Sequence, residues 1–362
     1  TLTKYKYGAY PVPEEGCAWM KRTDEFYLPR GKVQITAEVR LWIDKAVELW
    51  WDSNLFSLTR EVVSNAYGVD IRTFSECGVW IEASPGSAAH ILVPDYPKVL
   101  HRGLKGIIAE IIEGAQAKLN TGDPGAVDKW YFYQASKLVL NGMVVLAKRY
   151  ASLAREMAKE EKNVDRKREL EQIAQICVWV PLNPARNFCE AVQAFWFIML
   201  GVWMEAPRAL SAPPATLTRS LYPFYKRDKE EGRITDEQVI ELLQFLFIKF
   251  NQLAYVLPPH GHRFNQGRLG LQLGLGGLMA DGEDATNELG WLVLEAQQRI
   301  RLPEPLVNVV YHDKLSEEFL LKCVDLIRTG IGQPAFHSSS AGIERHLYHH
   351  KMPLEEARQF AI

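Results

Sequence analysis

The fold of this chain is decided by residues Leu269–Ile331, which read LGLQLGLGGLMADGEDATNELGWLVLEAQQRIRLPEPLVNVVYHDKLSEEFLLKCVDLIRTGI. Over Leu269–Leu275 leucine alternates with glycine or glutamine, a period of two that is typical of a short buried strand. Leu306–Tyr311 is a second run with β-type composition. The stretch therefore predicts two strands, with turn residues and a helical pattern between them.

The apolar residues between the two runs have a helical period: Leu289, Leu292, Val293, Ala296 and Ile300. Asp284 is the predicted N-cap of this helix, since its carboxylate can accept free amide N–H groups of the first turn. Ser316 is the predicted N-cap of a second helix, which Gly330 closes.

The order strand, helix, strand, helix indicates βαβ units and a parallel sheet. We expect strands near 270–275, 306–311 and 334–337 and helices near 285–301 and 317–329. The strands should be parallel, because a helical crossover joins parallel neighbours. The fold class is therefore α/β and rich in helix.

Elsewhere the chain is largely helical in pattern. Thr1–Arg30 reads as loop and short turns, and a helix begins near Pro97. Asn187–Val202 is apolar around its whole circumference, so it should be a core helix. Further helices are predicted at Thr36–Trp51, Ser57–Tyr67, Asp128–Ala158, Arg168–Val178 and Asp236–Phe250.

Composition excludes several classes of function. The chain has 362 residues, 47% of them apolar, and a formal net charge of −2, which gives no reason to expect nucleic acid or an acidic membrane as partner. No apolar run approaches the ~20 residues that span a bilayer, and no signal peptide is visible. The five dispersed cysteines are typical of reduced thiols in the cytoplasm.

Motifs for metals, nucleotides and serine nucleophiles are missing from the sequence. His260 and His262 form an H-x-H pair, but no carboxylate or cysteine completes a metal-ligand set at useful spacing. No GxGxxG followed by an acidic residue, no GxxxxGK[ST] and no GxSxG is present. We therefore predict no metal site and no nucleotide phosphate site.

Several segments together resemble the glycyl radical enzymes, the pyruvate formate-lyase superfamily. They are DGEDATNEL (281–289), LEAQQRIRLPEP (294–305), EEFLLKCVDLIRTGIGQPAF (317–336), HILVPDYPKVLHRGLKGI (90–107), NFCEAVQAFWF (187–197), LYPFYKRDKEEGRIT (221–235) and PLEEARQFAI (353–362). The resemblance covers the chain from about Ser84 onward and, weakly, the part before it. It implies one pyruvate formate-lyase-like domain over 1–362, forming part of a closed β/α barrel, with 1–82 as its N-terminal helical and loop segment.

The resemblance also implies where the chemistry takes place. In this family a glycine near the C-terminus stores a radical, and a cysteine that follows an EEAR-x-[FY]-A-[IL] segment abstracts a hydrogen atom from the substrate. This chain reads LEEARQFAI and stops at Ile362, so the catalytic cysteine, its neighbouring glutamate and the glycyl loop are expected beyond it. The piece alone is expected to be inactive, and Cys189 and Cys323 are interpreted as structural thiols.

The predicted substrate-binding residues are His90, Asn308, Phe336 and His337, which should converge on one concavity at the strand ends. His90 corresponds to a Gly-His of the family, with Ala89 in place of the glycine. The ordinary interpretation of each is packing or surface polarity.

The substrate class is inferred from a departure from the family pattern. Ala215-Thr216 stand where relatives carry Gly-Arg, and Thr218 stands where an aspartate is common. Because dehydratases of the family tend to use a nearby carboxylate on a substrate hydroxyl, decarboxylation of an arylacetate is favoured over dehydration of a diol.

The resemblance further implies a cytoplasmic homodimer in anaerobic metabolism, with no bound cofactor at rest. A separate iron–sulfur enzyme that uses S-adenosylmethionine would install the radical. Two alternatives stay open: a split or degenerate relative that acts as a binding or assembly subunit, and an unrelated α/β enzyme. A GC-x-E segment and a distal R-V-x-G-Y-like stretch after residue 362 would favour the enzyme.

Overall fold

The computed structural model describes residues 25–28, 31–34, 36–50, 55–69, 93–119, 125–205, 216–253 and 270–361. The chain forms two compact units. The first unit holds Thr1–Leu92, Ala206–Ser211 and Gln252–Gly270, and the second holds Val93–Glu205, Ala212–Asn251 and Leu271–Ile362.

The described part of the first unit contains a small strand pair and two helices. Strands β1 (Glu25–Leu28) and β2 (Gly31–Gln34) are antiparallel, and helices α3 (Ala37–Trp50) and α4 (Leu55–Tyr67) follow. Gly68, at φ +66°, ends α4 and donates its N–H to the Ser64 carbonyl at 2.8 Å. Both helices confirm the predictions, but the loop predicted up to Arg30 was wrong for β1, because a four-residue strand is too short to show a period.

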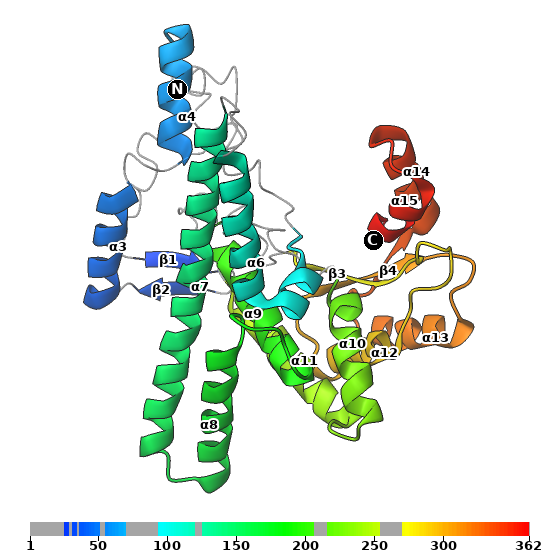
Figure 1. Cartoon of the computed structure of the whole chain (residues 1–362). Coiled ribbons are helices and arrows are strands. Elements are labelled where there is room, and N and C mark those ends of the chain that lie inside the picture. The colour runs from blue at the N-terminus through cyan, green and yellow to red at the C-terminus, as the bar shows by residue number, and fades with distance from the viewer. Residues whose placement is uncertain are drawn as a thin grey trace, which may run out of the picture. The chain divides into compact units, whose positions relative to one another are not determined.

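Three long helices begin the second unit. They are α6 (Tyr96–Leu119), α7 (Ala126–Glu160) and α8 (Val164–Trp179). Helices α7 and α8 lie side by side (Figure 1). Asn163 caps α8 by accepting the N–H groups of Asp165 and Arg166, each at 3.0 Å. A buried cluster joins α6 to α9: Leu104, Met143, Val144, Ala147, Ala151, Cys177 and Phe197.

Helix α9 (Phe188–Glu205) lies in the core, as its all-round apolar pattern predicts. Phe188, Phe195 and Met199 on this helix are each fully buried. Helices α10 (Leu217–Glu230) and α11 (Asp236–Gln252) follow α9 and precede the sheet. No helix in the described residues is both long and apolar enough to cross a membrane.

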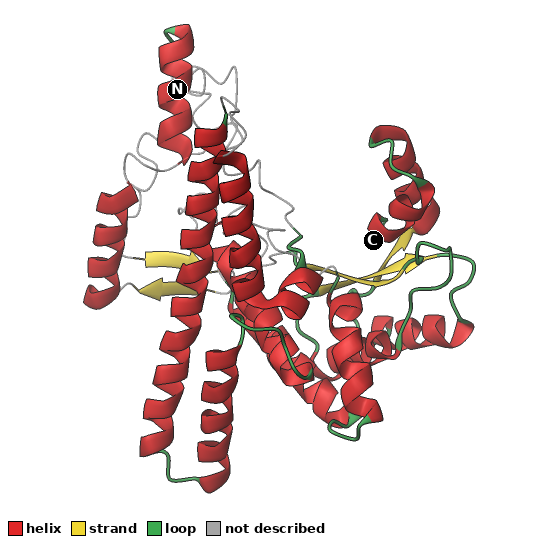
Figure 2. Ribbon diagram, in the orientation of Figure 1, coloured by secondary structure: helices red, strands yellow, loops and turns green. Residues whose placement is uncertain are grey.

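A three-stranded parallel sheet follows, as predicted (Figure 2). Its strands are β3 (Gln272–Gly276), β4 (Leu306–Tyr311) and β5 (Ala335–Ser338), in the order β3-β4-β5. Helix α12 (Glu288–Ile300) connects β3 to β4, and α13 (Glu317–Ile327) connects β4 to β5. Both pairings are parallel, which confirms the α/β fold class.

The helix caps match the prediction at one of two positions. Ser316 caps α13, since its side chain accepts the Phe319 N–H at 3.2 Å. The predicted cap at Asp284 was wrong: Asn287 caps α12 and accepts the Gly290 N–H at 3.3 Å. Asp284 instead accepts the N–H and the hydroxyl of Thr286, at 2.9 and 2.8 Å. This local turn delays the start of the helix.

One face of the sheet is apolar and buried. Leu273, Leu275, Val307 and Val309 point to the same side and are almost completely buried. They face the helices: an alanine methyl at Gly290 of α12 would lie 3.9 Å from Leu275 and 3.7 Å from Phe319 of α13. The opposite face carries Gln272, Asn308 and His337, together with the buried Val310. Helices α14 (Ser339–His349) and α15 (Leu354–Phe360) follow β5.

Candidate functional site

The structure brings together two of the four predicted site residues. Asn308 on β4 and His337 on β5 lie on the same face, and His337 Nε2 is 3.1 Å from Asn308 Oδ1. Because an amide oxygen only accepts, the imidazole donates its Nε2–H in this bond. The predicted pair thus forms a contact between neighbouring strands.

The other two predicted residues do not join this pair. Phe336 precedes His337 in β5, and successive side chains of a strand point to opposite faces. Phe336 therefore lies in register with Val309, on the helix-facing side, and the expectation that it shares a concavity with Asn308 and His337 was wrong. His90 lies outside the residues that the structure describes.

A third residue, Gln272 of β3, belongs to the site and was missed. The Asn308 amide nitrogen donates to Gln272 Oε1, and also to the Leu306 carbonyl at 3.3 Å. Gln272, Asn308 and His337, one from each strand, form what we call the polar ladder. The period-two pattern could have indicated that Gln272 lies on the face opposite the buried leucines, since it is the polar residue that alternates with them. Its partner, however, is 36 residues away in the chain.

The polar ladder has hydrogen-bonding capacity left at both ends. Asn308 is buried, at 9% exposure, while Gln272 is half-buried and His337 is exposed. Among the described residues, neither Gln272 Nε2 nor His337 Nδ1 has a partner. Gly274, paired with Asn308, faces the same side without a side chain. Glycine inside a strand is typical of places where a ligand or another backbone comes close.

A second polar pair lies beyond the carboxyl ends of β3 and β4. His312 Nε2 is 3.2 Å from Asp284 Oδ1, and His312 Nδ1 accepts the Lys314 N–H at 3.3 Å. Both ring nitrogens are therefore used, and His312 is only 8% exposed. The pair ties the loop after β3 to the loop after β4, and leaves no nitrogen free to act as a base.

The described cysteines have the properties of structural thiols, in agreement with the prediction. Cys323 on α13 is fully buried, and burial raises the pKa of its thiol to about 12. Burial likewise raises the pKa of Cys177 to about 11 and increases that of Cys189. A thiol with such a pKa stays protonated at neutral pH and is a poor nucleophile.

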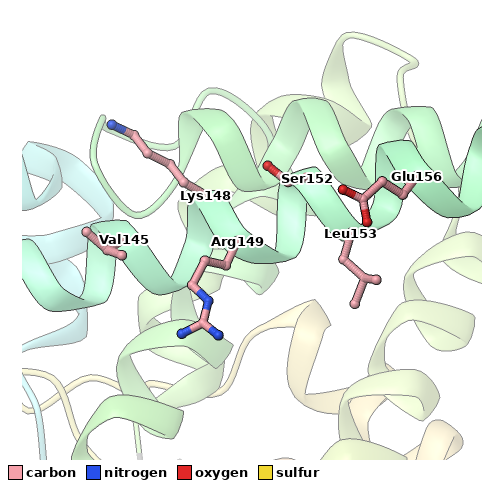
Figure 3. Close-up of a pocket in the computed structure, with 6 residues that line it drawn as sticks. All are labelled: Val145, Lys148, Arg149, Ser152, Leu153 and Glu156. Carbon is pink, nitrogen blue, oxygen red and sulfur yellow. The ribbon is translucent and has the colours of Figure 1, made fainter.

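The described residues contain neither a metal-ligand cluster nor a hollow with converging polar groups. In the part of the chain that the structure describes, no group of three or more His, Cys, Asp or Glu side chains could hold a metal ion. A shallow hollow lies along the surface of α7. Figure 3 shows that its lining residues all project from this one helix. They are Val145, Lys148, Arg149, Ser152, Leu153 and Glu156. Because no second element contributes to it, the hollow has no converging groups for chemistry.

Comparison with known proteins identifies a matching family. A family model described as "Pyruvate formate lyase-like" matches residues 2–362. An isethionate sulfite-lyase of Oleidesulfovibrio alaskensis is 38% identical over 248 residues, which cover 67% of this chain and 29% of that protein. An indoleacetate decarboxylase of Tractidigestivibacter scatoligenes is 32% identical over 366 residues, which cover 98% of this chain and 40% of that protein.

A solved structure is similar over almost the whole chain. The glycerol-bound form of the B12-independent glycerol dehydratase from Clostridium butyricum has a TM-score of 0.81 and 28% sequence identity, and covers 96% of this chain and 43% of that one. This chain therefore spans less than half the length of each of these relatives.

Proposed function

The chain belongs to the pyruvate formate lyase-like family of glycyl radical enzymes, and on that premise we propose that it forms the N-terminal and central part of a radical lyase. The reaction would be radical cleavage of a bond in a small organic substrate. The thiyl cysteine and the glycyl radical would be supplied by polypeptide beyond Ile362. The parallel strands β3, β4 and β5 would form part of the wall that encloses them.

The polar ladder is the observation that carries the proposed binding site. Its three side chains come from three adjacent strands and lie on the sheet face opposite the buried Leu273 and Leu275. Gln272 Nε2 can donate to a substrate oxygen at one end, and His337 Nδ1 can do so at the other when the imidazole is protonated. A charge-assisted hydrogen bond of this kind stabilises a bound carboxylate by about 1.5–3 kcal/mol. We retain His90 as a proposed contact.

Decarboxylation of an arylacetate is our first candidate reaction, ahead of dehydration of a diol. Thr218, where relatives commonly have an aspartate, lies in the first turn of α10 and is 5% exposed, so this position offers no carboxylate to a hydroxyl. An indoleacetate decarboxylase is among the proteins that match nearly the full chain. The aromatic ring would need an apolar wall other than Phe336.

We further propose the assembly that the family implies. The protein would be a cytoplasmic homodimer with no cofactor at rest, activated by a separate iron–sulfur enzyme that uses S-adenosylmethionine. The second candidate function is a binding or assembly subunit without catalysis. It is favoured by the absence of a nucleophilic thiol among the described cysteines.

The radical function is tested by activation under anaerobic conditions. The complete polypeptide that carries this chain, incubated with an activating enzyme, should show a glycyl-radical doublet in electron paramagnetic resonance and should then convert an arylacetate. Residues 1–362 expressed alone should show neither. No doublet from the complete polypeptide would favour the non-catalytic subunit, and a doublet from residues 1–362 would refute the location of the radical glycine.

The binding role of the polar ladder is tested by Asn308→Ala. The substitution removes the central link, so we expect KM to rise by about 10- to 100-fold, the equivalent of one hydrogen bond to a charged group. Val307→Ala is the matched control, because it truncates a buried side chain on the opposite face of the same strand. It should lower stability and leave KM unchanged. Equal KM values for both variants would show that the ladder does not contact substrate.

A further inference from the structure

The end of helix α15 is held by side chains from distant parts of the chain. α15 has seven residues, too few for a stable isolated helix. The Gln359 carbonyl in its last turn accepts a hydrogen bond from Arg219 Nη1 of α10 at 3.2 Å. The next carbonyl, of Phe360, lies 3.2 Å from His346 Nε2 of α14. Cationic or N–H donors suit this position, since the C-terminal carbonyls of a helix carry partial negative charge.

Arg219 joins α15 to the turn that follows β3. Its Nη2 donates to the Gly276 carbonyl at 3.2 Å and to the Leu278 carbonyl at 3.4 Å. The side chain is half-buried, and no carboxylate among the described residues lies within 4.0 Å of it. One guanidinium therefore bridges α10, the turn after β3 and the last turn of α15. A planar fork with several donors can make such a bridge, whereas the compact ammonium of lysine cannot.

The turn after β3 (Gly276–Gly282) is shaped to receive this side chain. Gly277, at φ +78°, would place a Cβ 3.0 Å from Arg219 Nη2. A second guanidinium holds the same turn, since Arg358 of α15 donates to the Ala280 carbonyl at 3.0 Å. A Cβ at Gly282, at φ +87°, would lie 3.2 Å from Arg358 Cζ. Glycine is required at both positions by backbone conformation and by the close approach of an arginine.

We propose that Arg219 is a positioning residue that fixes the end of α15 against the turn after β3, and so directs the chain that continues from residue 362. The inference rests on the proposed function, in which that continuation carries the hydrogen-abstracting cysteine. Such a cysteine must lie at a fixed distance from the substrate, and a displacement of about 1 Å can lower the rate about 10²-fold. Arg219 acts through this loop and does not contact substrate.

The first test uses the complete polypeptide and the variants Arg219→Met and Arg219→Lys. We expect Arg219→Met to lower kcat, expressed per glycyl radical, by about 10²-fold with KM unchanged. Arg219→Lys keeps the charge but cannot span the three carbonyls, so its kcat should lie between those of Arg219→Met and the natural protein. Lys226→Met removes an exposed charge from the same helix and is the matched control. The kcat of this control variant should stay within about twofold of that of the natural protein.

The second test does not need activity. Amide hydrogen exchange of α15, where the Ala361 N–H donates to the Ala357 carbonyl at 3.0 Å, should be about tenfold faster in Arg219→Lys, with exchange in β4 unchanged. Unchanged exchange in α15, or a raised KM with normal kcat, would overturn the inference. If the natural protein forms no radical, the proposed function fails, and the exchange measurement still decides whether Arg219 holds α15.

Discussion

Replacing Gly103 with alanine is expected to destabilise the second unit by about 3 kcal/mol or more. Gly103 interrupts α6 at φ 64° and ψ 165°, a conformation that residues with a side chain rarely adopt. A Cβ there would lie 2.5 Å from the Leu182 carbonyl oxygen and 2.5 Å from the Asn183 carbonyl carbon. The N–H groups of the next two residues donate to the Pro181 and Leu182 carbonyls at 2.8 and 2.9 Å. Because these bonds join the two segments, neither the backbone at Gly103 nor the backbone at Leu182 can move away without breaking them.

Gly142→Ala is the control for Gly103→Ala. Gly142 lies inside α7, and a Cβ there would meet nothing within 4 Å. Because alanine is a better helix former, this substitution should stabilise by about 1 kcal/mol. Unfolding by urea, followed by circular dichroism, measures both changes as shifts of the midpoint in opposite directions. Similar midpoints for the two variants would contradict the close approach at Gly103.

Asp228→Ala is expected to lower the free energy of unfolding by about 1–3 kcal/mol, because it leaves the buried Phe188 N–H without a partner. Asp228 is 3% exposed on α10. One carboxylate oxygen accepts the Phe188 N–H at 2.7 Å, at the start of α9. The other accepts from Arg233 Nη2 at 2.5 Å and Nε at 3.1 Å. The Asp228 carboxylate on α10 thus caps the start of α9, although Asp228 and Phe188 are 40 residues apart in the chain.

Asp236→Ala is the control for Asp228→Ala. Asp236 pairs with Lys229 and accepts the Tyr225 hydroxyl at 3.0 Å, but its side chain is 48% exposed. Pairs that water reaches contribute about 0–1 kcal/mol, so this substitution should have a small effect. Thermal unfolding distinguishes the two variants. If Asp236→Ala lowered the unfolding temperature as much as Asp228→Ala does, burial of the carboxylate would not set the size of the effect.

The periodicity of the sequence was enough to predict the parallel sheet and the helices that cross between its strands. Period two over Leu269–Leu275 and the helical period from Leu289 onward each depend on neighbours within a few residues. The cap at Ser316 is equally local, since it acts on an N–H three residues later. Segments such as DGEDATNEL indicated the family for the same reason: they can be recognised without knowing what they contact.

Local sequence patterns gave wrong predictions in two situations: where two neighbouring residues could each cap the same helix, and where a strand is very short. Asp284 and Asn287 are both good capping residues, and the Thr286 bonds to Asp284 decide which one begins α12. Strand β1 is four residues long, so no alternation could identify it. Phe336 was assigned to the pocket by its place at a strand end, whereas the register of β5 against β4 puts it on the same face as Val309, opposite Asn308 and His337.

By itself the sequence determined the order of strands and helices, two of the three residues of the polar ladder, and membership of the family. Only the tertiary structure decided that Gln272 completes the ladder, that Gly103 meets the Leu182 carbonyl, and that Arg219 holds a carbonyl 140 residues further along the chain. The physical reason is that side-chain periodicity records contacts within about one helical turn or one strand. Contacts between distant segments depend on how the elements pack, and no local pattern encodes them.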